Sequence, residues 1–396
     1  MKYNFDEIID RRGTGSVRWD MARKKYNEPD LIPLTTADMD FRAAKPVCDA
    51  IRDAADFGIF GYTQPKDSYY EAVQQRLKEK WHWDVKREWI TYSAGIVGAI
   101  AFCVQGMTKP GDAIAIMTPV YHPFAHIIED NGRKPVHTCL IQKEDGQPEI
   151  DFADLEKVIA ENKVKMLIFC NPHNPIGRVW KKDEINEICS LCVKYGVILI
   201  SDEIHSDFVF SGYQFCSVGP SMEEAAGLEQ LVVCTAASKS FNIAGLQCSG
   251  IIIPGEALRA KYRKMLMNQH FMEMNLIGPL ATEAGYRYGG EWLEQVCAYL
   301  EETRDFIADY LKKNTPQIKP VIPEATYMMW LDCRELGMSE KQLEEFLVHD
   351  ARVALNMGST FGEGGEGFVR INFGSPKAVI KEALDRICHA LEKKKN

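Results

Sequence analysis

The segment Leu231–Gln247 reads LVVCTAASKSFNIAGLQ and places Lys239 between two serines, just after an apolar, β-branched run. The run Leu231–Thr235 is typical of a buried strand, so Lys239 is expected just past the carboxyl end of that strand. A lysine in a partly desolvated pocket loses its proton more easily and becomes an amine nucleophile. Because most lysines are solvated surface charges, this interpretation needs support from other segments.

Two upstream segments supply that support. Asn174 lies in the stretch NPHNPIG (171–177) and Asp202 in the stretch SDEIH (201–205), and each stretch follows an apolar run. An amide, a carboxylate and an amine therefore follow strand ends in that order. These groups suit the ring hydroxyl, the ring nitrogen and the aldehyde of pyridoxal phosphate.

The composition is that of an ordinary globular protein, with 396 residues, 46% hydrophobic and 26% charged. This length suffices for two domains. The net charge of -9 argues against a nucleic-acid partner, since nucleic-acid binders normally show a basic face. No apolar run reaches membrane-spanning length, and the first residues lack a signal-peptide core. We therefore expect a cytoplasmic protein without a membrane partner.

The twelve cysteines are scattered along the chain, which favours free thiols over a disulfide framework. Cys189 and Cys192 form a CxxC pair, but the sequence holds no second pair to complete a metal site. The apolar spacing around them is helical, so we expect two buried thiols on a helix face and predict no metal.

Apolar runs alternate with amphipathic stretches between about residues 90 and 255, which indicates an α/β fold with a mostly parallel sheet covered on both faces. Ligands of such sheets lie at the carboxyl ends of the strands, so Asn171, Asp202 and Ser238 are expected to point into one crevice. The predicted strands are Asp112–Thr118, Pro135–Leu140, Lys165–Cys170, Val197–Asp202, Leu231–Thr235 and Cys248–Ile253, and the helices between them include Val97–Met107, Phe152–Glu161 and Lys182–Tyr195.

The pattern changes after about residue 285. A long helix (Trp292–Lys312), two short strands (Tyr327–Leu331 and Phe368–Phe373) and a closing helix (Lys377–Lys393) predict a smaller α+β domain. We assign residues 31–285 to a large cofactor-binding domain, and residues 1–30 and 286–396 to the small domain. The N-terminal segment is expected to pack beside the small domain.

Taken together, these motifs resemble the pyridoxal-phosphate enzymes of fold type I, the aminotransferase class I/II group, nearly from end to end. That resemblance implies a seven-stranded, mostly parallel sheet in the large domain. Finer details are similar to the cystathionine β-lyase and cysteine-S-conjugate β-lyase branch. They are Ala37–Phe41 (ADMDF), Asp202–His205 (DEIH) and Phe241–Gln247 (FNIAGLQ).

The resemblance implies roles for the residues of the predicted crevice. Lys239 would bind the cofactor as a Schiff base and then move the Cα proton of the substrate. Asp202 would face the ring nitrogen, and a buried carboxylate there keeps the ring protonated. Asn174 would donate to the ring oxygen and lie close to the substrate, and Tyr121 would stack on the ring; the plain alternatives are a turn asparagine and a core aromatic.

A phosphate site is expected where a strand runs into a helix at SAGIVG (93–98). Gly95 permits a close backbone approach, and the free N–H groups of Ile96 and Val97 suit an anion. Ser238 and Thr235 would add hydroxyl donors. Tyr62 resembles the family tyrosine that reaches across a homodimer to the partner's phosphate, so the active sites would be shared.

Arg370 is a charge within the apolar strand stretch FVRINF (368–373), and it would be costly to bury without a partner. A substrate α-carboxylate would satisfy its fork of donors, and the alternative is an internal salt bridge.

Two positions depart from the usual aminotransferase pattern. Gln247 stands where that pattern has a phosphate-binding arginine, and His205 stands where it has a tyrosine. Both substitutions are similar to the β-lyase branch. The stretch Gly362–Gly367 formally matches GxGxxG, but it leads into a strand and carries two glutamates, so we interpret it as a loop.

The resemblance therefore implies a homodimeric C–S β-lyase that cleaves cystathionine or a cysteine S-conjugate to a thiol, pyruvate and ammonia. Two alternatives stay open at this point. The first is an aminotransferase that consumes a 2-oxo acid, and the second is a regulatory or interaction protein on the same fold.

Overall fold

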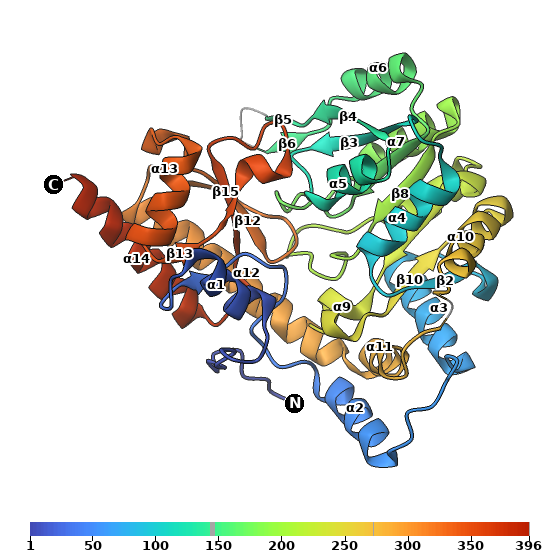
Figure 1. Ribbon diagram of the computed structural model, residues 1–396, viewed down its shortest axis with the longest axis horizontal. Helices are drawn as coiled ribbons and strands as arrows, with labels where there is room; N and C mark the ends of the chain where they lie inside the picture. Colours follow the sequence, from blue (N-terminus) through green and yellow to red (C-terminus); the bar gives the residue numbers. More distant parts are fainter. Residues whose placement is uncertain (143–146, 272, 396) are drawn as a thin grey trace.

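The computed structural model describes residues 1–142, 147–271 and 273–395. Its larger sheet has seven strands, of which only β10 runs antiparallel to its neighbours. The other neighbouring pairs in this sheet are parallel, as the sequence predicts. The order is β2 (Ile90–Ser93), β10 (Ser249–Ile252), β9 (Leu231–Thr235), β8 (Ile198–Asp202), β7 (Met166–Cys170), β3 (Ala113–Thr118) and β4 (Lys134–Cys139) (Figure 1).

Helices cover both faces of this sheet because successive strand residues point to opposite sides. Ile114 and Ile116 pack under one helix layer, whereas Ala113 and Ala115 pack under the other. The first layer contains α4 (Ile96–Met107), α5 (Pro123–Asp130) and α10 (Glu256–Asn268). The second contains α3 (Asp67–Trp81), α6 (Phe152–Asn162), α7 (Lys182–Tyr195) and α8 (Val218–Glu224).

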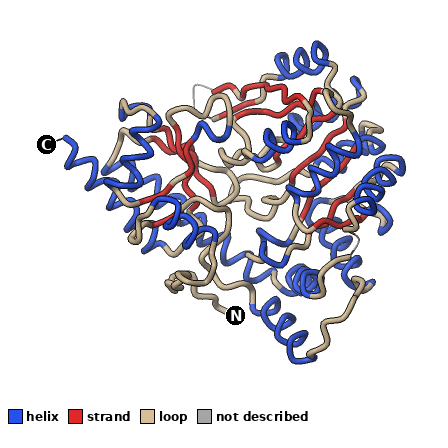
Figure 2. The backbone as a smooth tube through the Cα atoms, viewed as in Figure 1, coloured by secondary structure: helices blue, strands red, loops and turns tan. Residues whose placement is uncertain are grey.

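A second, antiparallel sheet forms the other body of the molecule, and Figure 2 shows its strands as a separate red group. Its order is β11 (Lys319–Val321), β12 (Met328–Asp332), β15 (Phe368–Asn372) and β14 (Asn356–Met357), and its helices are α12 (Gly290–Asn314), α13 (Glu340–Glu345) and α14 (Lys377–Lys395). The remaining helices are α1 (Ala22–Tyr26), α2 (Lys45–Phe57), α9 (Ala237–Ser240) and α11 (Ile277–Tyr288), and a short pair joins β5 (Ile141–Gln142) to β6 (Pro148–Glu149).

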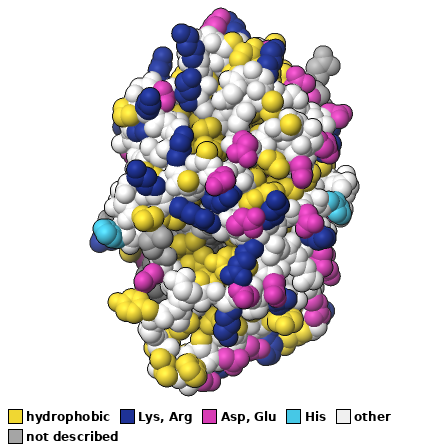
Figure 3. Space-filling view, turned by 90° about the vertical axis from the view of Figure 1, so that its right-hand side faces the viewer, with side chains coloured by type: hydrophobic (Ala, Val, Ile, Leu, Met, Phe, Trp, Pro, Cys, Tyr) yellow, Lys and Arg dark blue, Asp and Glu magenta, His cyan; other side chains and the backbone are white. Residues whose placement is uncertain are grey.

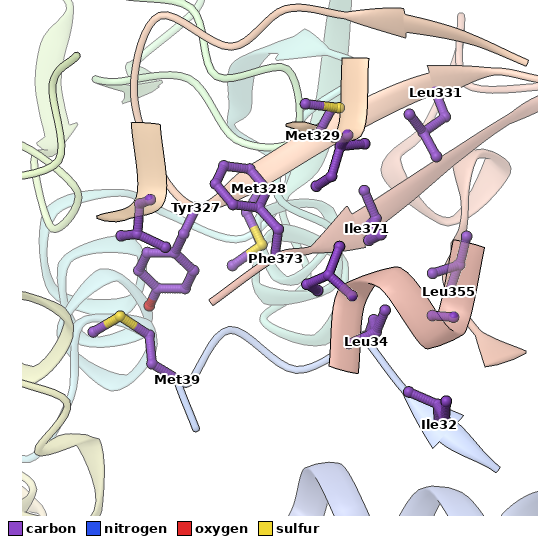
Figure 4. Packing of buried hydrophobic residues seen from close by; sticks show 14 of the residues in the cluster. Ile32, Leu34, Met39, Tyr327, Met328, Met329, Leu331, Leu355, Ile371 and Phe373 are labelled. Carbon is purple, nitrogen blue, oxygen red and sulfur yellow. The ribbon is translucent and has the colours of Figure 1, made fainter. Parts of the chain in front are cut away.

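The N-terminal segment packs beside the small body. The Tyr3 N–H donates to Gln295 of α12, and the Tyr26 hydroxyl donates to Glu344 of α13. Strand β1 (Ile32–Pro33) pairs in parallel with β13 (Val353–Ala354). Figure 4 shows Leu34 and Met39 of this segment beside Tyr327 and Phe373 of the small body. The domain boundaries at residues 30/31 and 285/286 stay a prediction.

Other expectations concern single elements. Cys189 and Cys192 are buried on α7, and none of the twelve cysteines forms a disulfide in the described structure. The stretch Gly362–Gly367 is a loop between a 3-10 turn (Gly358–Phe361) and β15, so the GxGxxG match lacks the helix that a dinucleotide site needs. In the described ranges, no helix is long and apolar enough to span a membrane.

Candidate active site

The strands β2, β3, β7, β8 and β9 end at one edge of the large sheet, and the residues that follow them surround a cavity. This edge is where open α/β sheets bind their ligands. Nine of the sequence-predicted residues line the cavity: Gly95, Ile96, Val97, Tyr121, Asn174, Asp202, His205, Ser238 and Lys239. These residues therefore surround one cavity, although they are up to 144 positions apart along the chain (95 to 239).

Lys239 lies on the short helix α9, one turn after β9 ends. Its Nζ donates a hydrogen bond to the backbone oxygen of Ala37 at 2.6 Å. Burial lowers the pKa of Lys239, and the nearby carboxylates of Asp38 and Asp202 oppose that effect. A lysine whose ammonium form is disfavoured in this way is suited to act as an amine nucleophile and a base.

The segment around Ala37 is held in place by Asn242, which follows Lys239 closely in the chain. Asn242 Oδ1 accepts from the Met39 N–H at 3.0 Å, and Asn242 Nδ2 donates to the carbonyls of Met39 and Phe41 at 2.9 and 2.8 Å. The Ala37 carbonyl also accepts from the Tyr327 hydroxyl at 3.1 Å. The ADMDF stretch therefore positions the carbonyl that meets the lysine.

Asp202 is the last residue of β8 and is buried with one carboxylate oxygen bonded to the Ile204 N–H at 3.2 Å. Burial raises the pKa of Asp202 to about 6, while that hydrogen bond and the charge of Lys239 lower it. The carboxylate reaches the cavity without a cation in contact among the described residues. It thus offers a strong acceptor to a protonated ring nitrogen.

His205 is buried next to Asp202 and packs edge-on against Tyr327, with ring centroids 5.6 Å apart. Burial, together with the charges of Lys239 and Arg370, lowers the pKa of His205 to about 3. The ring is therefore neutral at pH 7. Its Nδ1 is buried without a hydrogen-bond partner in the described part of the chain.

Gly95 immediately precedes α4, which begins at Ile96 without a side-chain cap. The first N–H groups of the helix therefore lack side-chain partners and face the cavity that Ile96 and Val97 line. A Cβ built on Gly95 would meet no protein atom within 4 Å. The open space beside this backbone is suited to an anion such as phosphate.

Arg370 comes from β15 of the antiparallel sheet and is only 2% exposed. Its Nη1 donates to Asn174 Oδ1 at 2.9 Å, and its Nη2 donates to Asn356 Oδ1 at 2.7 Å and to the Thr35 carbonyl at 2.8 Å. Among the described residues, no carboxylate lies within ion-pair distance of Arg370, and its Nε has no partner. The internal salt bridge that was the alternative is absent there, and burial lowers the pKa of Arg370 to about 10.

Arg370 lines a second cavity that adjoins the first. Ala37, Tyr121 and Lys239 line both cavities, so the two share a wall. Burial raises the pKa of the Tyr121 hydroxyl, so this side chain stays neutral at pH 7. Its ring packs edge-on against Phe124 with centroids 5.6 Å apart, which fixes the plane that it presents to the cavity.

Three of the residues that the sequence analysis placed at the site do not line the cavity. Asn171 was expected to point into the crevice, but its Nδ2 donates to the Cys216 carbonyl and it does not line the cavity. Asn174, at the start of the turn that follows, lines the cavity instead. Thr235 is buried at the end of β9 and also lies outside the cavity lining. Tyr62 is 95% exposed and lies away from the cavity of its own chain.

Sequence reasoning missed the residues that position the predicted ones. Tyr327, Asn356 and Thr35 hold the Ala37 carbonyl or the Arg370 guanidinium through hydrogen bonds. The ADMDF stretch is similar to the β-lyase branch, but the sequence did not predict that it positions the carbonyl that accepts from Lys239. Asn242 is half-buried at a positive φ. Asparagine is enriched at such positions, so its place just after Lys239 is a local signal for this support.

The residues present fit pyridoxal phosphate. An anion can lie against the Gly95 backbone, a cationic ring nitrogen can meet Asp202, and the aldehyde can meet Lys239. His205 Nδ1 lacks a partner, and Asn174 uses its amide oxygen on Arg370, which leaves the amide nitrogen to donate to a ring oxygen. A carboxylate, an amine and uncapped backbone N–H groups thus surround one cavity and match the groups of the cofactor.

The family model for aminotransferase class I and II matches residues 29–387. Cystathionine beta-lyase PatB of Bacillus subtilis is 39% identical over 388 residues, which cover 98% of this chain and 100% of PatB. Among solved structures, cystalysin from Treponema denticola, which contains a pyridoxal 5'-phosphate cofactor, is 36% identical with a TM-score of 0.96. It matches 99% of this chain and 100% of its own.

The PLP-bound C-S lyase from Staphylococcus hominis is also similar, at 34% identity and a TM-score of 0.90, over 98% of this chain and 99% of its own. These likenesses extend over the whole fold, including both bodies of the molecule.

Proposed function

The chain belongs to the aminotransferase class I and II family, and we propose that it is a pyridoxal-phosphate-dependent C–S β-lyase. The proposed reaction converts a cysteine thioether and water to a thiol, pyruvate and ammonia. The full-length similarity to a cystathionine beta-lyase carries this choice within the family. Gln247 and His205, which depart from the usual aminotransferase pattern, support it.

Each residue of the cavity has a distinct part in the proposed reaction. Lys239, Asp202, Asn174, His205 and the α4 amino end would hold the cofactor. When bound, pyridoxal phosphate supplies an electron-withdrawing ring that stabilises negative charge at the substrate Cα. Asp202 keeps that ring positively charged by offering a carboxylate to its nitrogen.

The proton and the leaving group are handled by the lysine and its surroundings. The Lys239 amine, with its pKa lowered by burial, takes the proton from Cα. Arg370 binds the α-carboxylate, which fixes the Cα–H bond toward the lysine. The thiolate then leaves from Cβ with the electron pair of the broken C–S bond. Tyr121, on the wall shared by both cavities, shields the reacting atoms from water.

We further propose a homodimer with shared active sites. The end of α2 and the segment after it expose several large apolar side chains. Hydrophobic side chains gather on the face in Figure 3, including its lower end at the level of α2. Val97 lines the cavity and is 41% exposed. A second copy covering this face would bury that apolar surface and bring Tyr62 toward its cavity. The exposed residues are Phe57, Ile59, Phe60 and Tyr62.

A cytoplasmic location fits the same proposal. None of the twelve cysteines forms a disulfide in the described structure, and most are buried. Reduced thiols are the normal state of cytosolic proteins.

The test separates the lyase from the aminotransferase. The cofactor-loaded protein is incubated with cystathionine and with S-ethylcysteine in the absence of any 2-oxo acid, and pyruvate and free thiol are measured together. Equal, sustained release of both supports the lyase. Conversion that begins only after a 2-oxo acid is added would replace it with an aminotransferase.

A further inference from the structure

The second cavity runs from the reacting centre to the surface, and its outer end carries two opposite charges. Its inner end is lined by Lys239 and Arg370, and its outer end by Lys25, Tyr26 and Glu344. Lys25 and Tyr26 belong to α1, whereas Glu344 belongs to α13. The N-terminal segment and the small body therefore build this outer end together.

The three outer side chains form a hydrogen-bonded chain. Lys25 Nζ donates to the Tyr26 hydroxyl oxygen at 3.0 Å, and that hydroxyl donates to Glu344 Oε1 at 3.0 Å. The Lys25 ammonium also lies 4.5 Å from the centre of the Tyr26 ring. In the described structure neither Lys25 nor Glu344 forms a direct ion pair, because the tyrosine hydroxyl separates them. Both charges keep unused donors or acceptors.

Between the two ends the wall combines apolar side chains with the polar residues Thr36, His122 and Thr360. Met21 from the N-terminal segment and Leu355 and Met357 from the β13–β14 region line this part of the cavity. Aliphatic and thioether side chains suit a thioether with its methylene groups, and they give no hydrogen bonds to a polar linker. The cavity thus offers an arginine suited to a carboxylate, apolar side chains on part of its wall and a hydrogen-bonded pair of opposite charges.

We propose that Lys25 and Glu344 determine specificity for a leaving thiol that itself carries an α-amino and a carboxylate group. The inference rests on the proposed C–S lyase function and narrows its substrate. Lys25 binds the distal carboxylate and Glu344 binds the distal ammonium, while Tyr26 holds the two charges apart. A ligand with an amino-acid group at each end of a thioether matches this order of charges. Cystathionine has that form, whereas an S-alkylcysteine lacks the distal charges.

The test uses four substrates that differ only in the distal group. They are cystathionine, S-(3-carboxypropyl)cysteine, S-(3-aminopropyl)cysteine and S-propylcysteine. Lys25→Gln is expected to lower kcat/KM about five- to tenfold for the two substrates with a distal carboxylate, cystathionine and S-(3-carboxypropyl)cysteine. Glu344→Gln is expected to lower kcat/KM by a similar factor for the two substrates with a distal amine, cystathionine and S-(3-aminopropyl)cysteine. Both variants should cleave S-propylcysteine within about twofold of the wild-type rate.

Two further variants serve as controls. Lys25→Arg retains the cation and should keep most of the discrimination, and Lys24→Gln removes a neighbouring exposed lysine that does not line the cavity. Because the outer charges are partly in contact with water, the discrimination should decrease as salt is added. Equal losses for all four substrates would show a merely structural effect and overturn the proposal, as would no loss for any.

Binding gives a readout that does not depend on turnover. In a Lys239→Ala background, calorimetry should find cystathionine bound more tightly than S-propylcysteine, and Lys25→Gln should remove most of that preference. If the wild type releases no thiol from S-propylcysteine or cystathionine, the lyase function fails, while the binding preference still tests the charge pair. If thiol is released but the preference is absent, only the specificity inference fails.

Discussion

Arg370 Nη1 and Asn174 Oδ1 are joined by a hydrogen bond of 2.9 Å, which connects the antiparallel sheet to the loop after β7. The residue expected at the substrate carboxylate therefore also orients the residue expected at the cofactor ring oxygen. Since both side chains share one contact, substitutions at the two positions should not act additively.

Replacing Arg370 by lysine keeps a positive charge but removes the planar fork of donors. The partner bonds to Asn174, Asn356 and the Thr35 carbonyl cannot all be kept by one ammonium group. We expect kcat/KM for cystathionine to fall about 10- to 100-fold, with KM rising. The matched control Arg386→Lys, at a half-buried arginine of α14 that lines neither cavity, should leave the steady-state kinetics unchanged. An unchanged kcat/KM in Arg370→Lys would remove this residue from the substrate site.

Lys239→Ala should abolish both turnover and the visible absorbance of covalently held cofactor. The amine at this position is the one that the cavity brings together with Asp202 and Asn174. Loss of a positioned base costs roughly 10²–10⁴-fold or more in rate. Absorption spectra and pyruvate release are measured beside the exposed-lysine control Lys157→Ala. Persistence of the cofactor band in Lys239→Ala would show that another amine holds the cofactor.

The protonation of Asp202 predicts how the cofactor-free protein responds to pH. Burial raises the pKa of Asp202 to about 6, so the folded state binds more protons than the unfolded state between about pH 4 and 6. The free energy of unfolding therefore falls as pH rises from about 4 to 6. Above pH 6 the buried Asp202 carboxylate is ionised, and it lowers the free energy of unfolding by the full amount. Asp202→Asn should therefore raise the Tm of cofactor-free protein at pH 8 but change it little at pH 4.5.

Bound cofactor should remove the gain in Tm that Asp202→Asn gives at pH 8. A protonated ring nitrogen compensates the Asp202 charge, so the wild type should gain more in Tm from added pyridoxal phosphate than Asp202→Asn gains. Thermal unfolding with and without cofactor measures both effects. A Tm difference between the two proteins that is the same at both pH values would show that the carboxylate is not the titrating group.

The large sheet could be predicted because its strands are apolar runs with helices between them. Leu231–Thr235 and Lys182–Tyr195 match the structure to the residue, since buried strands and amphipathic helices have strong periodic signals. The bounds of β2 were not predicted, although the turn that follows it was. Ile90–Ser93 is only four residues long, too short for a period to stand out.

The cavity could be predicted only for side chains that stand at strand ends. Ala37 contributes a backbone carbonyl to Lys239, and a carbonyl has no sequence signature. Tyr327 reaches Ala37 across 290 positions of chain. Asn356 meets Arg370 only because β14 pairs with β15 and places the two residues opposite each other. Asn171 and Asn174 shared the same motif, and only the turn geometry decided which of them faced inward.

Asn242 tests how much this support matters. Its φ of 56° lies in the left-handed region, and its side chain bonds three backbone groups of Met39 and Phe41. Asn242→Ala leaves those groups without partners and strains the backbone, so we expect a loss of roughly 2–3 kcal/mol in the free energy of unfolding. Cofactor affinity should fall with it, because the Ala37 carbonyl is no longer fixed.

Asn242→Gly separates the two causes. Glycine accepts the positive φ without strain but makes no side-chain bonds, so it should be less destabilising than alanine by about 1 kcal/mol. Denaturant unfolding and cofactor titration of both variants give the comparison. Equal stability of wild type and Asn242→Gly would show that the bonds to the N-terminal segment contribute nothing.

Tyr62 provides the test of shared active sites. Tyr62→Phe should weaken cofactor retention, because it removes a hydroxyl that the proposed homodimer directs to the partner's phosphate.

Tyr62→Ala and Lys239→Ala should each be nearly inactive alone. In a mixed dimer, however, one site would combine the intact Lys239 of one chain with the intact Tyr62 of the other. Random pairing of equal amounts makes half of the dimers mixed, so about one quarter of wild-type activity should return. If each site were complete within one chain, mixing would restore nothing beyond the sum of the two variants, and Tyr62 would have to be explained as an ordinary exposed residue of the dimer-facing segment.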